Sequence, residues 1–184
     1  MQLTAKTTAL VLIDLQKGIL ARATELHAAS VVYESSMRFA RRLRAAGGRV
    51  VRVRVSFSPD LGDTPPNLVD QPADYASFKP GWDEFPEAPD PSDIVITKRQ
   101  WGAFHGTELD LQLRRRGVRC IVLGGISTNI GVESTARTAM ELGYELVVAE
   151  DLCASTTAQM HAFSFQFILP RLGRVTDSGK IALA

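Results

Sequence analysis

The sequence contains few of the residues that build disulfide frameworks or metal centres. Of its 184 residues, only two are cysteines and three are histidines. Two cysteines in a chain of this length give no disulfide framework, and Cys120 falls in an apolar run typical of a buried strand. His27, His105 and His161 lie far apart and lack the short spacing of a metal-ligand set. The sequence therefore predicts no catalytic metal.

Net charge and long apolar runs are also lacking. The formal net charge is +1, and 22% of the residues are charged. Such a balance creates no overall field that would attract nucleic acid or an anionic membrane. The longest apolar run is far shorter than the roughly 20 residues of a membrane-spanning helix. No signal-peptide pattern opens the chain, since Thr4, Lys6 and Thr7 lead directly into an apolar run. We therefore expect a cytoplasmic protein that acts on a small molecule and binds neither nucleic acid nor membrane.

The sequence does contain an alternation of short apolar runs and amphipathic segments. Continuous apolar runs are typical of strands buried on both faces of a parallel sheet. The expected strands cover residues 8–13, 50–57, 93–97, 121–123, 145–149 and 173–176. The expected helices cover residues 28–47, 107–117, 127–143 and 155–169, and Pro170 is expected to end the last of them. The length suits one domain, residues 1–184, with an α/β fold whose parallel sheet is covered by helices on both faces.

Residues 58–91 have a different composition. They hold eight of the nine prolines, together with Phe78, Trp82 and Phe85. The segment shows neither helical nor strand periodicity, but its aromatic residues argue against disorder. We expect it to cover a crevice or to pack on a neighbouring subunit. Trp82 is a candidate pocket wall, and simple loop packing is the alternative.

Two charged residues come where predicted strands end. Asp14 follows the first strand and Lys98 follows the third. Residues at the carboxyl ends of strands in an open α/β sheet line the ligand crevice. A carboxylate there can instead cap the next segment, and a lone lysine there is usually solvated. Trp101 and Phe104 shortly after Lys98 favour a functional site, because an ammonium beside a carboxylate and an aromatic wall would form an activated pair.

A third candidate lies in residues 121–137. There an apolar run meets Gly124 and Gly125, and Ser127 then opens a helical stretch. A strand that ends in a glycine turn and opens a helix points several backbone N–H groups at one spot, which suits an anion or a developing oxyanion. An ordinary turn between strand and helix is the alternative. The chain has no G-x-G-x-x-G fingerprint and no P-loop, so the sequence predicts no cofactor.

The same stretch resembles a known family. The segment GISTNIGVESTA is similar to the pattern G-[IV]-x-T-x-x-C-V-x-x-T-A of the isochorismatase-like, or cysteine hydrolase, superfamily. Gly131 falls at the position of the nucleophilic cysteine. The segments DLQ after the first strand and KRQWGAF around Lys98 are also similar to its patterns, so the resemblance spans nearly the whole chain. It implies a three-layer α/β/α, Rossmann-like fold with a six-stranded parallel sheet in the order 3-2-1-4-5-6. It also implies a homo-oligomer, a dimer or larger.

The resemblance also implies roles for individual residues. Asp14, Lys98 and Gly131 would occupy the catalytic triad positions, although Gly131 offers no nucleophile. A cis peptide bond would join Ile126 and Ser127. The N–H groups of Ser127 and Gly131 would hold an oxyanion.

True isochorismatases, which cleave a vinyl ether to give pyruvate, carry glycine at this position and need no covalent step. By this resemblance Asp14 would protonate the vinyl carbon if burial raises its pKa, and Lys98 would hold a substrate carboxylate or balance charge. The candidate substrate contacts are Gln16, Trp82, Gln100, Trp101 and Phe104. The triplet STN in the turn resembles an amidase-like subgroup instead. Two alternatives therefore stay open, hydrolysis of an amide with water as nucleophile and an inactive relative that binds a small carboxylate.

Overall fold

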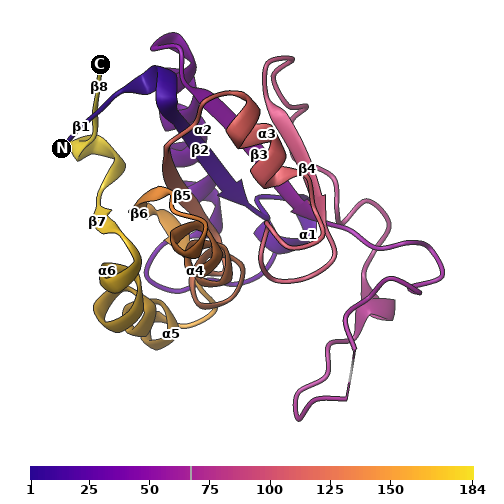
Figure 1. Cartoon of the computed structure of the whole chain (residues 1–184). Coiled ribbons are helices and arrows are strands. Elements are labelled where there is room, and N and C mark those ends of the chain that lie inside the picture. The colour runs from indigo at the N-terminus through magenta and orange to yellow at the C-terminus, as the bar shows by residue number, and fades with distance from the viewer. Residues whose placement is uncertain (67) are drawn as a thin grey trace.

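Six parallel strands form the central sheet of the computed structural model, which describes residues 1–66 and 68–184. In chain order they are β2 (Thr8–Ile13), β3 (Arg49–Val55), β4 (Ile94–Lys98), β5 (Cys120–Ile126), β6 (Glu145–Ala154) and β7 (Arg174–Thr176). Across the sheet the order is β4-β3-β2-β5-β6-β7, and all neighbouring pairs are parallel (Figure 1). Numbered along the chain, the strands have the expected order 3-2-1-4-5-6, so the predicted fold is confirmed.

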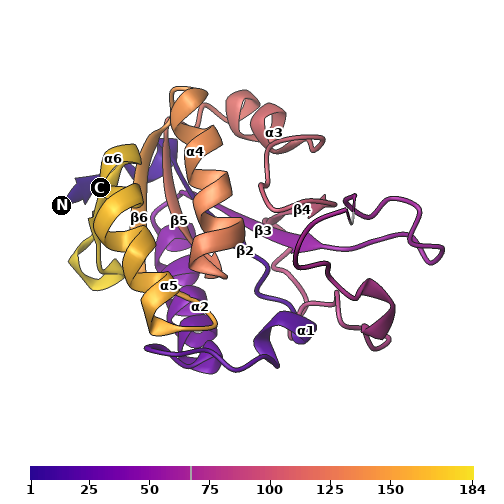
Figure 2. The same cartoon turned by 90° about the horizontal axis from the view of Figure 1, so that it is seen from below.

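Strand β2 shows why a continuous apolar run forms the centre of this sheet. All six of its residues are buried. Leu10 and Leu12 pack with residues of α2 (Ala29–Ala45) on one face. Val11 and Ile13 pack on the other face, where helices α3 (Leu109–Arg115), α4 (Glu133–Glu141) and α6 (Leu169–Leu172) contribute to the core. Figure 2 shows the resulting three layers. Because each face of β2 meets a helix layer, both sets of alternating residues must be apolar.

The helices on the second face are α3 (Leu109–Arg115), α4 (Glu133–Glu141), α5 (Ala158–Phe163) and α6 (Leu169–Leu172). A π-helical turn, Ser164–Ile168, joins the last two. The expectation that Pro170 ends this segment was wrong. Pro170 lies in the first turn of α6, where a proline needs no N–H partner, and the helix continues to Leu172.

The termini pair with each other outside the main sheet. Strand β1 (Gln2–Leu3) runs parallel to β8 (Ala182–Leu183), which brings the two ends of the chain side by side (Figure 1). Strands of two residues have no periodicity, so the sequence did not predict them. Single 3-10 turns occur at Ala5–Thr7, Tyr75–Ser77 and Ser178–Lys180. Among the described residues, no helix is long and apolar enough to cross a membrane.

The chain between β3 and β4 leaves the sheet at the carboxyl ends of the strands and extends away from the body (Figures 1 and 2). It then folds back beside the short helix α1 (Lys17–Leu20). The Gly18 N–H donates to the Trp82 carbonyl at 2.7 Å, and the Lys17 N–H donates to the Glu84 carbonyl at 2.9 Å. Helix α1 and the end of this segment therefore form one side of the crevice above the strands.

Candidate active site

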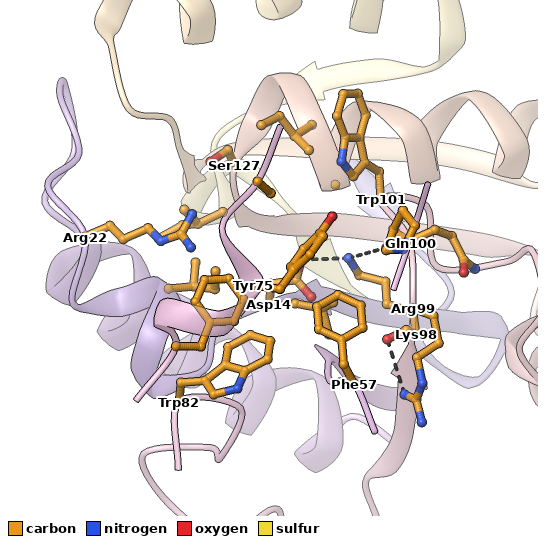
Figure 3. A pocket seen from close by; sticks show the side chains of 18 residues that line it. Asp14, Arg22, Phe57, Tyr75, Trp82, Lys98, Arg99, Gln100, Trp101 and Ser127 are labelled. Atoms are coloured by element: carbon orange, nitrogen blue, oxygen red, sulfur yellow. Dashed lines mark hydrogen bonds and ion pairs between the residues drawn. The ribbon is translucent and has the colours of Figure 1, made fainter. Parts of the chain in front are cut away.

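A pocket of about 270 Å³ opens at the carboxyl ends of the central strands (Figure 3). Asp14 follows β2, Lys98 ends β4 and Ser127 follows β5, and all three line the pocket. Strands β2 and β5 are neighbours at the point where the strand order reverses. Ligands of open α/β sheets bind at such a point. The volume suits a small molecule.

Asp14 and Lys98 form a buried ion pair in this pocket. Lys98 Nζ lies 2.7 Å from Asp14 Oδ2, and the two side chains are 2% and 9% exposed. The same ammonium donates a hydrogen bond of 2.9 Å to the Gln100 carbonyl. Asp14 Oδ1 is buried and has no hydrogen-bond partner in the described part of the chain. This oxygen therefore has an unfilled acceptor position.

Burial controls the titration of Asp14. Removal of the carboxylate from water raises its pKa above the ordinary value, because a protein interior disfavours the charged form. Lys98 and Arg22 act in the opposite direction without cancelling this effect. Asp14 thus keeps its proton to a higher pH than an exposed aspartate does. Such a pKa suits a group that transfers a proton during a reaction.

Gly131 borders the carboxylate of this pair. A Cβ atom built on Gly131 would lie 2.8 Å from Ile13 Cγ2 and 3.3 Å from Asp14 Oδ2. The first distance is too short for a carbon–carbon contact, so Ile13 would have to move. The second would place a methyl group directly beside the carboxylate. Glycine at this position therefore lets Ile13 and Asp14 pack directly against the backbone of the turn.

Buried side chains hold the turn between β5 and α4. The Ile126–Ser127 peptide bond is cis, and a π-helical turn, Thr128–Val132, follows it. The Thr128 hydroxyl is hydrogen-bonded to His161 Nδ1 at 2.8 Å, and the Thr135 hydroxyl donates to the Gly131 carbonyl at 2.7 Å. His161 was not among the predicted site residues, because a single histidine in an apolar helix gives no signal in the sequence.

Aromatic side chains from the segment after β3 form the wall opposite this turn. The rings of Phe78 and Trp82 lie 4.3 Å apart, and those of Phe57 and Tyr75 lie 4.8 Å apart. All four residues line the pocket, as do Gln100 and Trp101. The segment therefore covers the crevice, which was one of its two expected positions. Phe57, Tyr75 and Phe78 had not been singled out as pocket residues, because an irregular segment has no periodicity that shows which side chains point inward.

Comparison with known proteins agrees with this geometry. The family model of the isochorismatase domain matches residues 8–180. The chain belongs to the isochorismatase family. It is 51% identical to the isochorismatase family protein YecD of Escherichia coli O157:H7, over 98% of this chain and 97% of that protein. It is 32% identical to the ureidoacrylate amidohydrolase RutB of Methylorubrum extorquens, over 80% of this chain and 69% of that protein.

Solved structures give the same result for the fold. An isochorismatase family protein from Burkholderia thailandensis superposes with a TM-score of 0.91 at 40% identity, covering 96% of this chain and 94% of that one. The N-carbamoylsarcosine amidase of Thermoplasma acidophilum superposes with a TM-score of 0.74 at 25% identity, covering 95% and 98%. The chain is thus an isochorismatase-family hydrolase.

Two predicted pocket residues of this isochorismatase-family chain lie elsewhere. Gln16 is fully buried, donates to the Val55 carbonyl at 2.9 Å and accepts from the Val55 N–H at 2.9 Å. It fixes the end of β3 and does not line the pocket. Phe104 is 6% exposed and packs in the core beside Tyr144, with ring centres 5.9 Å apart. Its side chain turns away from the pocket while Trp101 of the same loop reaches it.

Gln16→Leu is expected to destabilise the fold. The N–H and carbonyl of the half-buried Val55 would lose their partners, which costs about 1–3 kcal/mol of the free energy of unfolding. Urea unfolding measures this loss. Gln159→Leu, on an exposed position of α5, is the matched control and should change the value by less than about 0.5 kcal/mol. Equal effects of the two substitutions would show that the Gln16 hydrogen bonds do not stabilise the end of β3.

Within residues 1–66 and 68–184, no group of three or more histidine, cysteine, aspartate and glutamate side chains is placed to hold a metal ion. Both cysteines are buried, and burial raises the pKa of each thiol. Neither cysteine is among the described residues that line the pocket.

Proposed function

We propose that this hydrolase cleaves a small carboxylate-bearing molecule with water and forms no covalent enzyme intermediate. The buried Asp14–Lys98 pair beside Gly131 is the observation that carries this proposal. We take Gly131 to stand at the position of the family's nucleophilic cysteine. Ser127 lines the pocket, but among the described lining residues there is no histidine to activate its hydroxyl. Water is then the nucleophile.

The reaction that fits Asp14 best is hydrolysis of a vinyl ether of pyruvate. The protonated Asp14 carboxyl donates its proton to the terminal vinyl carbon, which forms a C–H bond and leaves an oxocarbenium ion. Water adds to that ion, and the hemiketal breaks its C–O bond to release an alcohol and pyruvate. Lys98 stabilises the carboxylate that remains on Asp14. The proton lost by the attacking water then returns to this carboxylate, so Asp14 is again a neutral acid. A raised pKa serves this role, because an acid must hold its proton until the substrate arrives.

Hydrolysis of a C–N bond is the second candidate. It is supported by the names of two relatives, the ureidoacrylate amidohydrolase RutB and the N-carbamoylsarcosine amidase. Asp14 would then take a proton from water and pass it to the leaving nitrogen, while backbone N–H groups of the turn at Ser127 stabilise the oxyanion. Both candidates need Asp14, but they need it in opposite protonation states when the substrate binds.

The pH dependence of kcat/KM distinguishes the two candidates. If Asp14 is an acid, kcat/KM falls as pH rises through the pKa of its carboxyl; if it is a base, kcat/KM falls as pH decreases. Lys98→Met removes the ammonium that lowers this pKa. The part of the pH profile in which kcat/KM changes, here called the limb, should therefore move to higher pH. Lys180→Met, at a residue 73% exposed and paired with Asp177, should leave the limb in place. A limb that Lys98→Met does not move would contradict the assignment to Asp14.

Mass spectrometry of the intact protein tests the absence of a covalent intermediate. The wild-type protein is mixed with 2-ethoxyacrylate, isochorismate, N-carbamoyl amino acids and simple amides, and the mixture is quenched in acid during turnover. We expect product release from at least one substrate class and an unmodified protein mass. An amide substrate would leave an acyl adduct on a serine nucleophile, and a vinyl ether would leave a ketal adduct. A mass increase that matches either adduct, and that disappears in Ser127→Ala, would instead show that Ser127 is a nucleophile.

A further inference from the structure

Three positively charged side chains line the pocket, and two of them have carboxylate partners. Lys98 is paired with Asp14. The Arg99 guanidinium is paired with Asp63, and the side chains of this second pair are 42% and 34% exposed. Asp14 is the only carboxylate among the described residues that line the pocket. In both pairs the positively charged group already has a carboxyl partner before any ligand binds.

Arg22 is the third positively charged residue of the lining. Its guanidinium has a ring contact with Phe78, 5.7 Å from the ring centre. Across the described residues its side chain has neither an ion pair nor a hydrogen bond. Arg22 also lowers the pKa of Asp14, so its charge reaches the reactive carboxylate. Among the described lining residues, Arg22 is thus the positively charged group without a carboxyl partner, and its N–H donors match a carboxylate.

Hydrogen bonds fix the backbone on both sides of Arg22. On one side, Gly18 donates to the Trp82 carbonyl, and a Cβ on Gly18 would lie 2.8 Å from Trp82 Cβ, so the two backbones are in close contact. On the other side, the Glu25 N–H donates to the Ser155 carbonyl at 3.1 Å. Figure 3 shows Arg22 and Lys98 reaching the pocket from opposite sides of Asp14 and Tyr75. This arrangement places the free guanidinium across the pocket from the ion pair.

We infer that Arg22 binds the carboxylate of the substrate and selects it over a neutral group of the same shape. A carboxylate at Arg22 leaves the other end of the molecule at Asp14 Oδ1, while Phe57, Tyr75 and Trp82 cover its apolar part. Arg22 is the better carboxylate anchor, because Lys98 is 2% exposed and two of its three N–H donors already face Asp14 and the Gln100 carbonyl. That the bound carboxylate belongs to a substrate rests on the proposed function. The preference for a charged ligand depends only on the residues of the pocket.

Binding of a charged ligand and its neutral isostere tests this inference without any turnover. The probes are benzoate and benzamide, and the signal is the fluorescence of Trp82 and Trp101, which both line the pocket. We expect wild-type protein to bind benzoate more tightly than benzamide. Arg22→Gln should weaken benzoate binding by about 10-fold or more, which is the usual effect of losing a charge-assisted hydrogen bond, and should leave benzamide binding unchanged within about twofold. The control is Arg38→Gln, on an exposed position of α2 outside the pocket lining, and it should change neither dissociation constant.

Two results would overturn the inference. They are benzoate binding no tighter than benzamide in wild-type protein, and equal weakening of both probes by Arg22→Gln. Hydrolysis is measured on the same variants. If no substrate is hydrolysed but the Arg22-dependent selection persists, the proposed function fails and the carboxylate site stands. If hydrolysis occurs, Arg22→Gln should raise KM more than it lowers kcat, because Arg22 contacts the part of the substrate that does not react.

Discussion

Asp14→Asn is expected to lower kcat by about 10²- to 10⁴-fold, the usual contribution of a positioned acid or base. Asparagine retains the shape of the side chain but cannot exchange a proton with the substrate. It also leaves Lys98, 2% exposed, without its counter-charge. Removal of one partner of a buried pair costs about 3–5 kcal/mol of the free energy of unfolding. The measurement is therefore kcat on the best substrate, beside urea unfolding of the same protein to show that the variant is folded in the assay.

The matched control for Asp14→Asn is Asp93→Asn. The Asp93 side chain is buried and forms an ion pair of 2.8 Å with Arg44. It precedes β4, at the opposite end of that strand from Lys98. The control removes a paired carboxylate in the same way but far from the pocket, so it should lower stability and leave kcat within about twofold. Equal loss of kcat in the two variants would contradict a chemical role for Asp14.

Gly131→Ala is expected to lower kcat/KM by about 10²-fold, because displacement of reacting groups by about 1 Å has effects of this size. The added methyl group would occupy the space 3.3 Å from Asp14 Oδ2 and force Ile13 to move. Overpacking of this kind also destabilises a fold by about 1–3 kcal/mol. Kinetics and urea unfolding of the variant measure the two effects separately.

Gly179→Ala is the matched control for this substitution, because a Cβ on Gly179 would meet no atom within 4 Å. It should leave both kcat/KM and the free energy of unfolding close to wild type. A Gly131→Ala protein with wild-type kcat/KM would show that the close packing of Gly131 against Ile13 and Asp14 is not needed for the reaction.

The elements and their order could be predicted from the sequence because the signals are local. A run such as TALVLI is apolar on both faces, and only a strand between two layers of helices buries both. The strand order then followed from the resemblance carried by the turn at Gly131 and by the segments around Asp14 and Lys98. These three residues meet in the structure because the carboxyl ends of parallel strands share one edge of the sheet.

The sequence could not show which way individual side chains turn. Gln16 is two residues after Asp14, yet it binds the backbone of Val55 and not the pocket. Phe104 is three residues after Trp101, yet it points into the core. Arg22 lies in a short irregular segment and was not expected in the pocket at all. These orientations depend on tertiary contacts between segments far apart in the chain, which no periodicity encodes.

The central claim is that Asp14 transfers a proton while water cleaves a small carboxylate-bearing molecule. The most direct test is pyruvate release from 2-ethoxyacrylate and isochorismate by wild-type protein and by Asp14→Asn at the same pH. If the claim is correct, wild-type protein releases pyruvate and the variant loses the activity by at least about 10²-fold. If neither protein releases pyruvate, the claim requires that wild-type protein hydrolyse N-carbamoyl acids faster than Asp14→Asn by a similar factor. Equal product release by both proteins would contradict the claim.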